Sequence, residues 1–244
     1  MTEKQSGPPK ISAEQTENSH SMPVPHPRYR IFLLSPANLA GIKARRIMAD
    51  NAPSGLACRL RAAGVPLGEL FSFVSSLYFR GKLSYAEAFA VPPPKVSGSF
   101  VITSDAGLLP PDTLVTLDRV REIAANDIDP SNPKYRDPLC RDCHALSEML
   151  KDAGEVVLLG SVATAKYVEP LLEIFRERLL FPKDFVGRGD MSRGGLMLRC
   201  VEAGNELVYA PVLNATLHGA KPPKLLPAVR NPVKVSGLSP ASVR

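Results

Sequence analysis

The segment Tyr29–Ser35, with the sequence YRIFLLS, indicates the fold class of this chain. It is a compact apolar run, and the turn sequence SPAN begins at its last residue. A continuous apolar run of this length suits a strand that is buried on both faces, as in a parallel sheet covered by helices. The sequence therefore predicts a buried strand here and an α/β domain built around it.

Similar apolar runs recur along the chain and are separated by segments with apolar residues at helical spacing. The predicted strands are 99–104 (SFVITS), 155–160 (EVVLLG), 179–182 (LLFP) and, at an edge of the sheet, 205–212 (NELVYAPV). This alternation predicts a single three-layer (α/β/α) domain with a mainly parallel sheet of about four to five strands.

Glycine and proline set the expected limits of several helices. The segment 69–90 is expected to be helical with one break at Gly81. The segment 128–138 holds three prolines and is expected to be a loop. Pro170 is expected to kink the helix of 161–179 or to mark its true start.

The two ends of the chain differ in composition from its body. Residues 1–28 are polar and proline-rich, and 219–244 are basic and proline-rich, so both are predicted to be disordered tails around a domain at 29–218. The net charge is +6, but the five basic residues of 219–244 leave 25 basic and 24 acidic residues elsewhere. The charge of the body therefore does not indicate nucleic-acid binding. The basic tail either contacts a polyanion or is simply solvated.

No apolar run reaches the roughly 18 residues of a membrane span, and the N-terminal segment lacks the apolar core of a signal peptide. We expect a cytoplasmic protein without membrane association. The sequence CRDCH at 140–144 matches a c-type haem attachment motif, but nothing supplies the export that this requires, and zinc would need a fourth ligand. Leu139, Cys143 and Leu146 recur at helical spacing, so a helix with reduced thiols, no metal and no cofactor is expected.

Polar and small residues follow each of the four main predicted strands. Because ligands bind outside the carboxyl ends of such strands, these residues are the predicted site. The ligand-binding candidates are Ser35, Asn38, Ser104, Gly107, Gly160, Ser161, Arg188, Gly189, Ser192 and Arg193, and the catalytic candidates are Asp105 and Asp190. The set suits hydrogen bonding to a nucleotide-like or sugar-like ligand. The alternative is that these residues only cap helices.

The stretch Phe185–Cys200, FVGRGDMSRGGLMLRC, contains four glycines, three arginines and one aspartate. Asp190 is expected to be the N-cap of a helix that Gly204 ends. Free amides at the start of this helix, with Arg188 and Arg193, would favour an anion, although the stretch is no Walker loop. In the alternative interpretation, an arginine–aspartate pair merely stiffens the loop, and the glycines allow close packing.

Four segments in order resemble those of a known family: SSLYFRGKLSYAEAFA, FVITSDAGLLPPDTLV, VVLLGSVATAKYVEPLL and LLFPKDFVGRGDMSRGGLMLRC. Together, over roughly residues 29–205, they resemble an uncharacterised bacterial family allied in fold to the uracil-DNA-glycosylase-like α/β superfamily and to a domain of archaeosine synthase. The peroxide-stress DNA-binding proteins have a similar Gly-Leu-Leu-x-Pro turn. The resemblance implies a three-layer α/β fold and the handling of a nucleobase, nucleotide or nucleic acid.

The chain departs from uracil-DNA glycosylases at both of their characteristic loops. Where they carry an Asp-Pro-Tyr-type loop after the first strand, this chain has Ser35-Pro36-Ala37-Asn38. Where they carry a late His-Pro-Ser loop, it offers only His218 in the sequence LHGAK. Base excision by that chemistry is therefore not expected.

Three functional hypotheses follow from the sequence. The first is binding of a nucleotide, nucleobase or nucleic acid at the carboxyl ends of the strands. The second is an enzyme acting on a nucleoside or sugar phosphate, glycosylase- or transferase-like, with Asp105 or Asp190 as general base or nucleophile and Arg188 and Arg193 holding an anion. The third is a non-catalytic interaction module that uses an apolar helix face.

Overall fold

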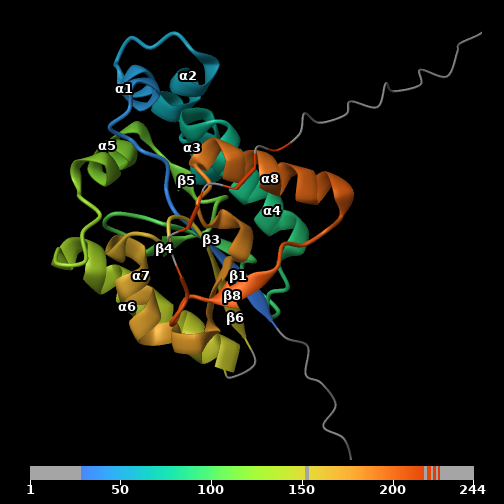
Figure 1. The fold of residues 1–244 in the computed structure, drawn as a ribbon. Helices are drawn as coiled ribbons and strands as arrows, with labels where there is room; N and C mark the ends of the chain where they lie inside the picture. Colours follow the sequence, from blue (N-terminus) through green and yellow to red (C-terminus); the bar gives the residue numbers. More distant parts are fainter. Residues whose placement is uncertain (1–28, 152–153, 217–218, 221, 224, 226–244) are drawn as a thin grey trace, which may run out of the picture.

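A six-stranded sheet forms the middle layer of the computed structural model, which describes residues 29–151, 154–216, 219–220, 222–223 and 225 (Figure 1). The strand order is β4-β3-β1-β6-β7-β8. The four central strands are parallel, and the edge strands β4 and β8 are antiparallel to their neighbours. The bounds are β1 Arg30–Leu34, β3 Ser99–Ile102, β4 Leu108–Leu109, β6 Glu155–Leu159, β7 Leu179–Pro182 and β8 Tyr209–Pro211. The predicted α/β class and mainly parallel sheet are thus confirmed.

Strand β1 lies in the centre of the sheet and is buried on both faces, as the sequence predicts. The side chains of Ile31 and Leu33 pack into one hydrophobic cluster, and those of Phe32 and Leu34 pack into the other. All four are fully buried, because helices cover both faces of the sheet.

The helices divide between the two faces of the sheet. Those that pack on the side of Phe32 are α1 Ile42–Met48, α2 Gly55–Ala62, α3 Leu67–Ser75, α4 Leu77–Phe89, α5 Leu117–Ala125 and α8 Asp190–Ala203. Those on the side of Ile31 are α6 Pro133–Leu150 and α7 Ala165–Phe175. A small antiparallel pair, β2 Val65–Pro66 with β5 Leu114–Val115, lies apart from the main sheet.

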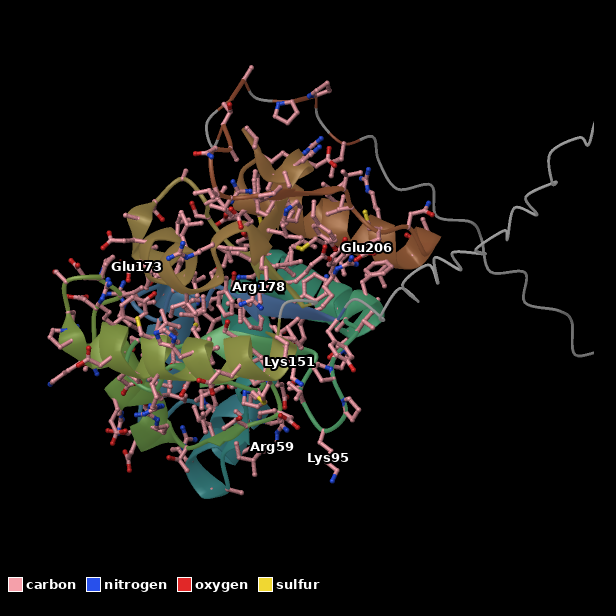
Figure 2. The ribbon with its side chains drawn as sticks, turned by 90° about the horizontal axis from the view of Figure 1, so that it is seen from below. Arg59, Lys95, Lys151, Glu173, Arg178 and Glu206 are labelled. Atoms are coloured by element: carbon pink, nitrogen blue, oxygen red, sulfur yellow. The ribbon has the colours of Figure 1, made fainter. Side chains whose placement is uncertain are left out.

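Side-chain contacts join α6 to α7 and to the short 3-10 helix η2, Arg176–Arg178. Arg136 on α6 pairs with Glu173 on α7 at 2.6 Å. Arg178 donates to the carbonyl oxygen of Lys151 just after α6, and Figure 2 shows these two residues close together. These contacts hold the helix that follows β6 against the helix that precedes it.

The order of the strands reverses beside β1. The chain passes from β1 through α1–α4 to β3 on one side, and after α5 and α6 it returns to β6 on the other side of β1. Each parallel strand points the same way, so the residues after β1, β3 and β6 meet at one edge of the sheet. This edge is where doubly wound sheets bind ligands.

The break in the helical segment 69–90 lies at Ser76 and not at Gly81, so that prediction is wrong. Ser76 has a φ of 47°, which ends α3 and starts α4 in a new direction. Gly81 lies within α4, where α8 approaches so closely that a side chain would not fit. A Cβ atom on Gly81 would lie 2.7 Å from the carbonyl oxygen of Gly194.

The predicted loop at 128–138 is partly wrong, because α6 begins at Pro133. Asn132 caps this helix by accepting a hydrogen bond from the amide of Lys134 at 3.1 Å, and proline at the first helical position costs no hydrogen bond. In α8 the N-cap is Gly189, so Asp190 is the first helical residue and not the cap. Gly204 ends α8 in the left-handed conformation, as predicted.

Candidate functional site: the cleft at the strand ends

A cleft of about 690 Å³ lies at the carboxyl ends of β1, β3 and β6. We call it the strand-end cleft. Its lining includes five of the residues that the sequence predicts for the site, namely Ser35, Asn38, Ser104, Ser161 and Asp190. Sequence reasoning did not select its other polar and aromatic members, which are Phe71, Ser75, Tyr78, Asn126, Asp127, Asp129, Lys166 and Tyr167.

The polar residues after the strands are held by backbone partners. The Ser104 hydroxyl donates to the carbonyl oxygen of Ile123 at 2.6 Å, which ties the end of β3 to α5. The Asn38 side chain accepts from the amide of Ala40 at 2.9 Å and so closes the turn after β1. Both side chains keep further hydrogen-bonding capacity for a ligand.

Aromatic side chains from three different helices line the cleft. Phe71 comes from α3, Tyr78 from α4 and Tyr167 from α7, and all three are buried. The Tyr78 hydroxyl is buried and faces the guanidinium group of Arg193. Burial raises the pKa of Tyr78 to about 12, with the positive charge of Arg193 acting against the rise. Tyr78 therefore keeps its proton at neutral pH, and its hydroxyl can donate a hydrogen bond to a ligand or accept one.

Acidic groups predominate among the charged residues at the mouth of the cleft. Asp127, Asp129 and Asp190 line it and are exposed, and Lys166 is the basic residue that lines it. Hydrogen bonds from the backbone amide and hydroxyl of Ser131, at 2.8 and 2.7 Å, lower the pKa of Asp129. The cleft thus presents negative charge, which opposes a phosphate and attracts amino groups or hydroxyls.

Asp105 lies outside the strand-end cleft. Its carboxylate forms a bidentate pair with Arg119, at 2.7 and 2.8 Å, and lines a separate hollow together with Glu122 and Lys134. Both carboxylate oxygens of Asp105 are therefore engaged by one guanidinium group, an arrangement typical of a structural ion pair.

Two of the predicted glycines are needed for close packing. Gly107 has a φ of 71°, and a Cβ atom there would lie 2.5 Å from the carbonyl oxygen of Pro138. Gly160 follows β6, and its Cβ atom would lie 2.9 Å from the Cβ atom of Ser35. Gly160 therefore leaves space for Ser35, which lines the cleft.

The arginines of the glycine-rich stretch bind the protein's own backbone. The Arg193 guanidinium donates twice to the carbonyl oxygen of Phe185, at 3.0 and 3.2 Å, and lies 3.7 Å from Asp190. Arg188 donates to the hydroxyl of Ser192 at 3.3 Å and to the carbonyl oxygen of Pro223 at 3.4 Å. The geometry thus favours the alternative in which these arginines order the loop.

The glycines of this stretch accommodate neighbouring backbone. Gly187 has a φ of 70°, and a Cβ atom there would lie 2.3 Å from the carbonyl oxygen of Ala220. A Cβ atom on Gly194 would lie 2.6 Å from the carbonyl oxygen of Leu77 in α4. Gly189 has open space around it. The described residues of 219–225 therefore pack on the loop, and α4 packs on the helix after it.

Lys82 is the functional candidate that sequence reasoning missed. Its side chain is buried in α4, 1% exposed, and its ammonium group donates to both the carbonyl oxygen and the hydroxyl of Ser35. It also lies over the rings of Tyr78 and Phe79, at 4.4 and 4.9 Å from their centroids. The signal was present in the sequence: Lys82 lies four residues after Tyr78, on the helix face that carries the buried side chains.

Burial is the main cause of the unusual ionisation of Lys82. Removal of the ammonium group from water lowers the pKa of Lys82 from 10.5 to about 7, the negative charge of Asp190 opposes this fall, and the positive charge of Arg193 adds to it. A lysine that loses its proton near neutral pH can act as an acid or a base, which exposed lysines do not do well.

In the described part of the chain the cysteines are not arranged as ligands of a metal ion. All four are free, and CRDCH lies within α6 with Cys143 on the buried face beside Leu139 and Leu146. Burial raises the pKa of the Cys143 thiol. No three His, Cys, Asp or Glu side chains among the described residues are grouped to hold a metal ion. Nor does any described helix have the length and apolar character needed to cross a membrane.

Comparison with known proteins adds no assignment, because no family model, curated protein or solved structure gives a significant match to the chain. The geometry of the cleft is therefore the basis for a functional proposal.

Proposed function

We propose that the chain binds a nucleobase or nucleoside in the strand-end cleft. The observation that carries this proposal is the meeting of Ser35, Ser104, Ser161 and Asp190 with the rings of Phe71, Tyr78 and Tyr167 in one cleft of about 690 Å³. That volume falls within the roughly 300–1,000 Å³ of small-molecule sites.

The chemistry of the lining supports a base in particular. Aromatic side chains provide surfaces on which a base can stack, a contact that contributes about 1–3 kcal/mol in single-stranded nucleic-acid sites. The oxygens of Asp190, Asp127 and Asn126 can accept hydrogen bonds from exocyclic amino groups or ribose hydroxyls. The family resemblance implies a ligand of the same class.

The charge of the cleft favours an unphosphorylated ligand over a nucleotide or nucleic acid. Three carboxylates line it against Lys166, and the two arginines expected to hold an anion are bound to the carbonyl oxygens of Phe185 and Pro223. A phosphate group would approach three carboxylates, and neither arginine lines the cleft to offset their charge. The hypothesis of an enzyme on a sugar phosphate loses support for the same reason.

Calorimetric titration with the four common nucleosides and their 5′-monophosphates tests the proposal. We expect at least one nucleoside to bind and its monophosphate to bind more weakly. Asp190→Asn is expected to weaken nucleoside binding by about ten- to a hundredfold, because a hydrogen bond to a charged group contributes roughly 1.5–3 kcal/mol. The same change should reduce the discrimination against the monophosphate.

Asp184→Asn is the matched control, since Asp184 is exposed and does not line the cleft. It should leave nucleoside binding unchanged. Melting temperatures of both variants would exclude unfolding as the cause, because Asp190 is an exposed first-turn residue of α8 and contributes at most about 1 kcal/mol to that helix. Tighter binding of monophosphates than of nucleosides, or no binding of either, would contradict the proposal.

A further inference from the structure

We propose that Ser35 and Lys82 form a serine–lysine catalytic pair, with the Ser35 hydroxyl as nucleophile and the Lys82 amine as its general base, that transfers an acyl group from an ester or amide in the strand-end cleft. The substrate class within the proposed function is an acylated nucleoside, and only this last detail rests on the nucleoside proposal.

The two side chains are in hydrogen-bonding contact. The Nζ atom of Lys82 lies 3.0 Å from the Oγ atom of Ser35, within the range expected for a nucleophile and its base. Ser35 lines the cleft, and Lys82 lies behind it and is shielded from solvent. A ligand in the cleft can therefore reach the serine, while the lysine contacts the serine and not bulk water.

The hydroxyl proton of Ser35 has only one weak competing acceptor among the described residues. The carbonyl oxygen of Leu159 lies 3.4 Å from the Ser35 Oγ atom, a long distance for a hydroxyl hydrogen bond. Gly160 leaves the space that the serine occupies, since a Cβ atom there would lie 3.1 Å from the same Oγ atom. The serine is thus free to direct its proton to Lys82 when the lysine is neutral.

Burial favours the neutral form of Lys82, and it outweighs the contacts that favour the charged form. In the described part of the chain no carboxylate makes a hydrogen bond or ion pair with Lys82; the Ser35 oxygens accept from its ammonium group, and the rings of Tyr78 and Phe79 attract its charge. The charged groups that face it are Asp190 and Arg193, both from α8, and they act in opposite directions on its pKa. With a pKa of about 7, a substantial fraction of Lys82 can accept a proton at neutral pH.

A purely structural role explains this lysine poorly. Burial of an ammonium group without an anionic partner is costly, and an apolar side chain of similar length would fill the same space without that cost. The combination of a buried lysine, a contacting serine and a cleft lined by that serine matches the serine–lysine variants of nucleophilic catalysis.

The proposed step balances without any further reagent except water. The Ser35 oxygen bonds to the carbonyl carbon, its proton passes to the Lys82 amine, and the carbonyl electron pair moves to oxygen. Collapse of this intermediate breaks the bond to the leaving group, which takes the proton from Lys82. Water then attacks the acyl-serine ester, gives its proton to Lys82 and releases the acid; the proton returns to the Ser35 oxygen.

A fluorophosphonate probe tests the pair without knowledge of the substrate. The serine oxygen bonds to phosphorus, fluoride leaves, and the product is read as a mass increase on the peptide that contains Ser35. We expect the wild-type chain to be labelled at Ser35 alone, with a rate that rises with pH around a midpoint near 7 as Lys82 loses its proton. Ser35→Ala should abolish labelling, and Lys82→Met should slow it at least about a hundredfold.

Ser84→Ala is the matched control, because Ser84 lies on α4 like Lys82 but does not line the cleft. This variant should be labelled at Ser35 as fast as the wild-type chain. Lys82→Arg keeps a positive charge but cannot serve as a base at these pH values, so it should also lose labelling. Should the Lys82 variants not fold, the pH profile of the wild-type chain still tests the lysine.

Absence of labelling of the wild-type chain, labelling at another serine, or a rate independent of pH between 6 and 9 would overturn the pair. The nucleoside proposal can fail separately from the pair. If Ser35 is labelled, no nucleoside slows the labelling and calorimetry detects no nucleoside binding, the serine–lysine pair stands and the nucleoside proposal is rejected. Nucleoside binding without labelling keeps the nucleoside and rejects the pair.

Discussion

Replacement of Gly194 by alanine is expected to lower the free energy of unfolding by about 1–2 kcal/mol, because two helix backbones touch at this residue. An added Cβ atom would lie 2.6 Å from the carbonyl oxygen of Leu77 and 2.8 Å from the Cα atom of Tyr78. Neither atom can move without displacing α4, and overpacking of this kind costs roughly 1–3 kcal/mol or more. The better helix propensity of alanine, up to about 1 kcal/mol, offsets only part of that cost.

The adjacent Gly195 provides the control for this prediction. Its Cβ atom would have one neighbour, the Leu225 Cδ1 atom at 3.7 Å, which is an ordinary van der Waals contact. Gly195→Ala should therefore be neutral or stabilise the fold by up to about 1 kcal/mol. Urea unfolding of the two variants under identical conditions makes the comparison, and equal stabilities would show that α4 and α8 do not meet as closely as described.

The contact between α4 and α8 also positions the candidate site. Tyr78 itself meets Gly194, Lys82 follows Gly81, which also meets Gly194, and Asp190 starts α8. In Figure 1, α8 lies alongside α4 for much of its length. Gly194→Ala is thus expected to weaken ligand binding as well as stability, since a shift of α4 moves Tyr78 and Lys82 relative to Ser35.

The central features of the fold could be predicted from the sequence because they depend on local pattern. A strand buried on both faces must be apolar throughout, so the residues Ile31–Leu34 identify β1 without knowledge of its neighbours. The break at Ser76 could not be predicted in this way. Serine rarely adopts a positive φ, and Gly81, which looks like a natural break, is required instead by a helix more than a hundred residues away.

The residues of the site also fall into two groups: those that local sequence pattern predicts and those that only the folded structure brings together. Ser35, Ser104 and Ser161 meet because parallel strands end at a common edge, which a strand prediction already implies. The arginines were a less reliable guide, since Arg188 and Arg193 bind carbonyl oxygens that only the folded loop brings near them. Lys82 reaches Ser35 across 47 residues of sequence, and no local pattern predicts that contact.

The exchange of Lys82 for methionine is expected to change how stability depends on pH. Lys82 has a pKa of about 7 in the folded chain and an ordinary value of 10.5 when exposed, so between these values the unfolded chain holds a proton that the folded chain lacks. The free energy of unfolding therefore rises with pH through this window, by up to about 1.4 kcal/mol per pH unit. Below pH 7 both states are protonated, and the full cost of the buried charge remains.

Lys82→Met removes this contribution. The free energy of unfolding of the variant should therefore exceed that of the wild-type chain most at pH 6, and the difference should shrink by roughly 3 kcal/mol between pH 7 and 9.5. Urea unfolding of both proteins across this range measures the difference between their free energies of unfolding. The contributions of other titratable groups are common to both proteins and cancel in this difference. Lys134→Met serves as the control for loss of a lysine: Lys134 is exposed on α6, so the stability of this variant should differ little from that of the wild-type chain throughout the range. Parallel profiles for the wild-type chain and Lys82→Met would mean that Lys82 keeps its proton in the folded state, and the general base proposed for Ser35 would then be absent at neutral pH.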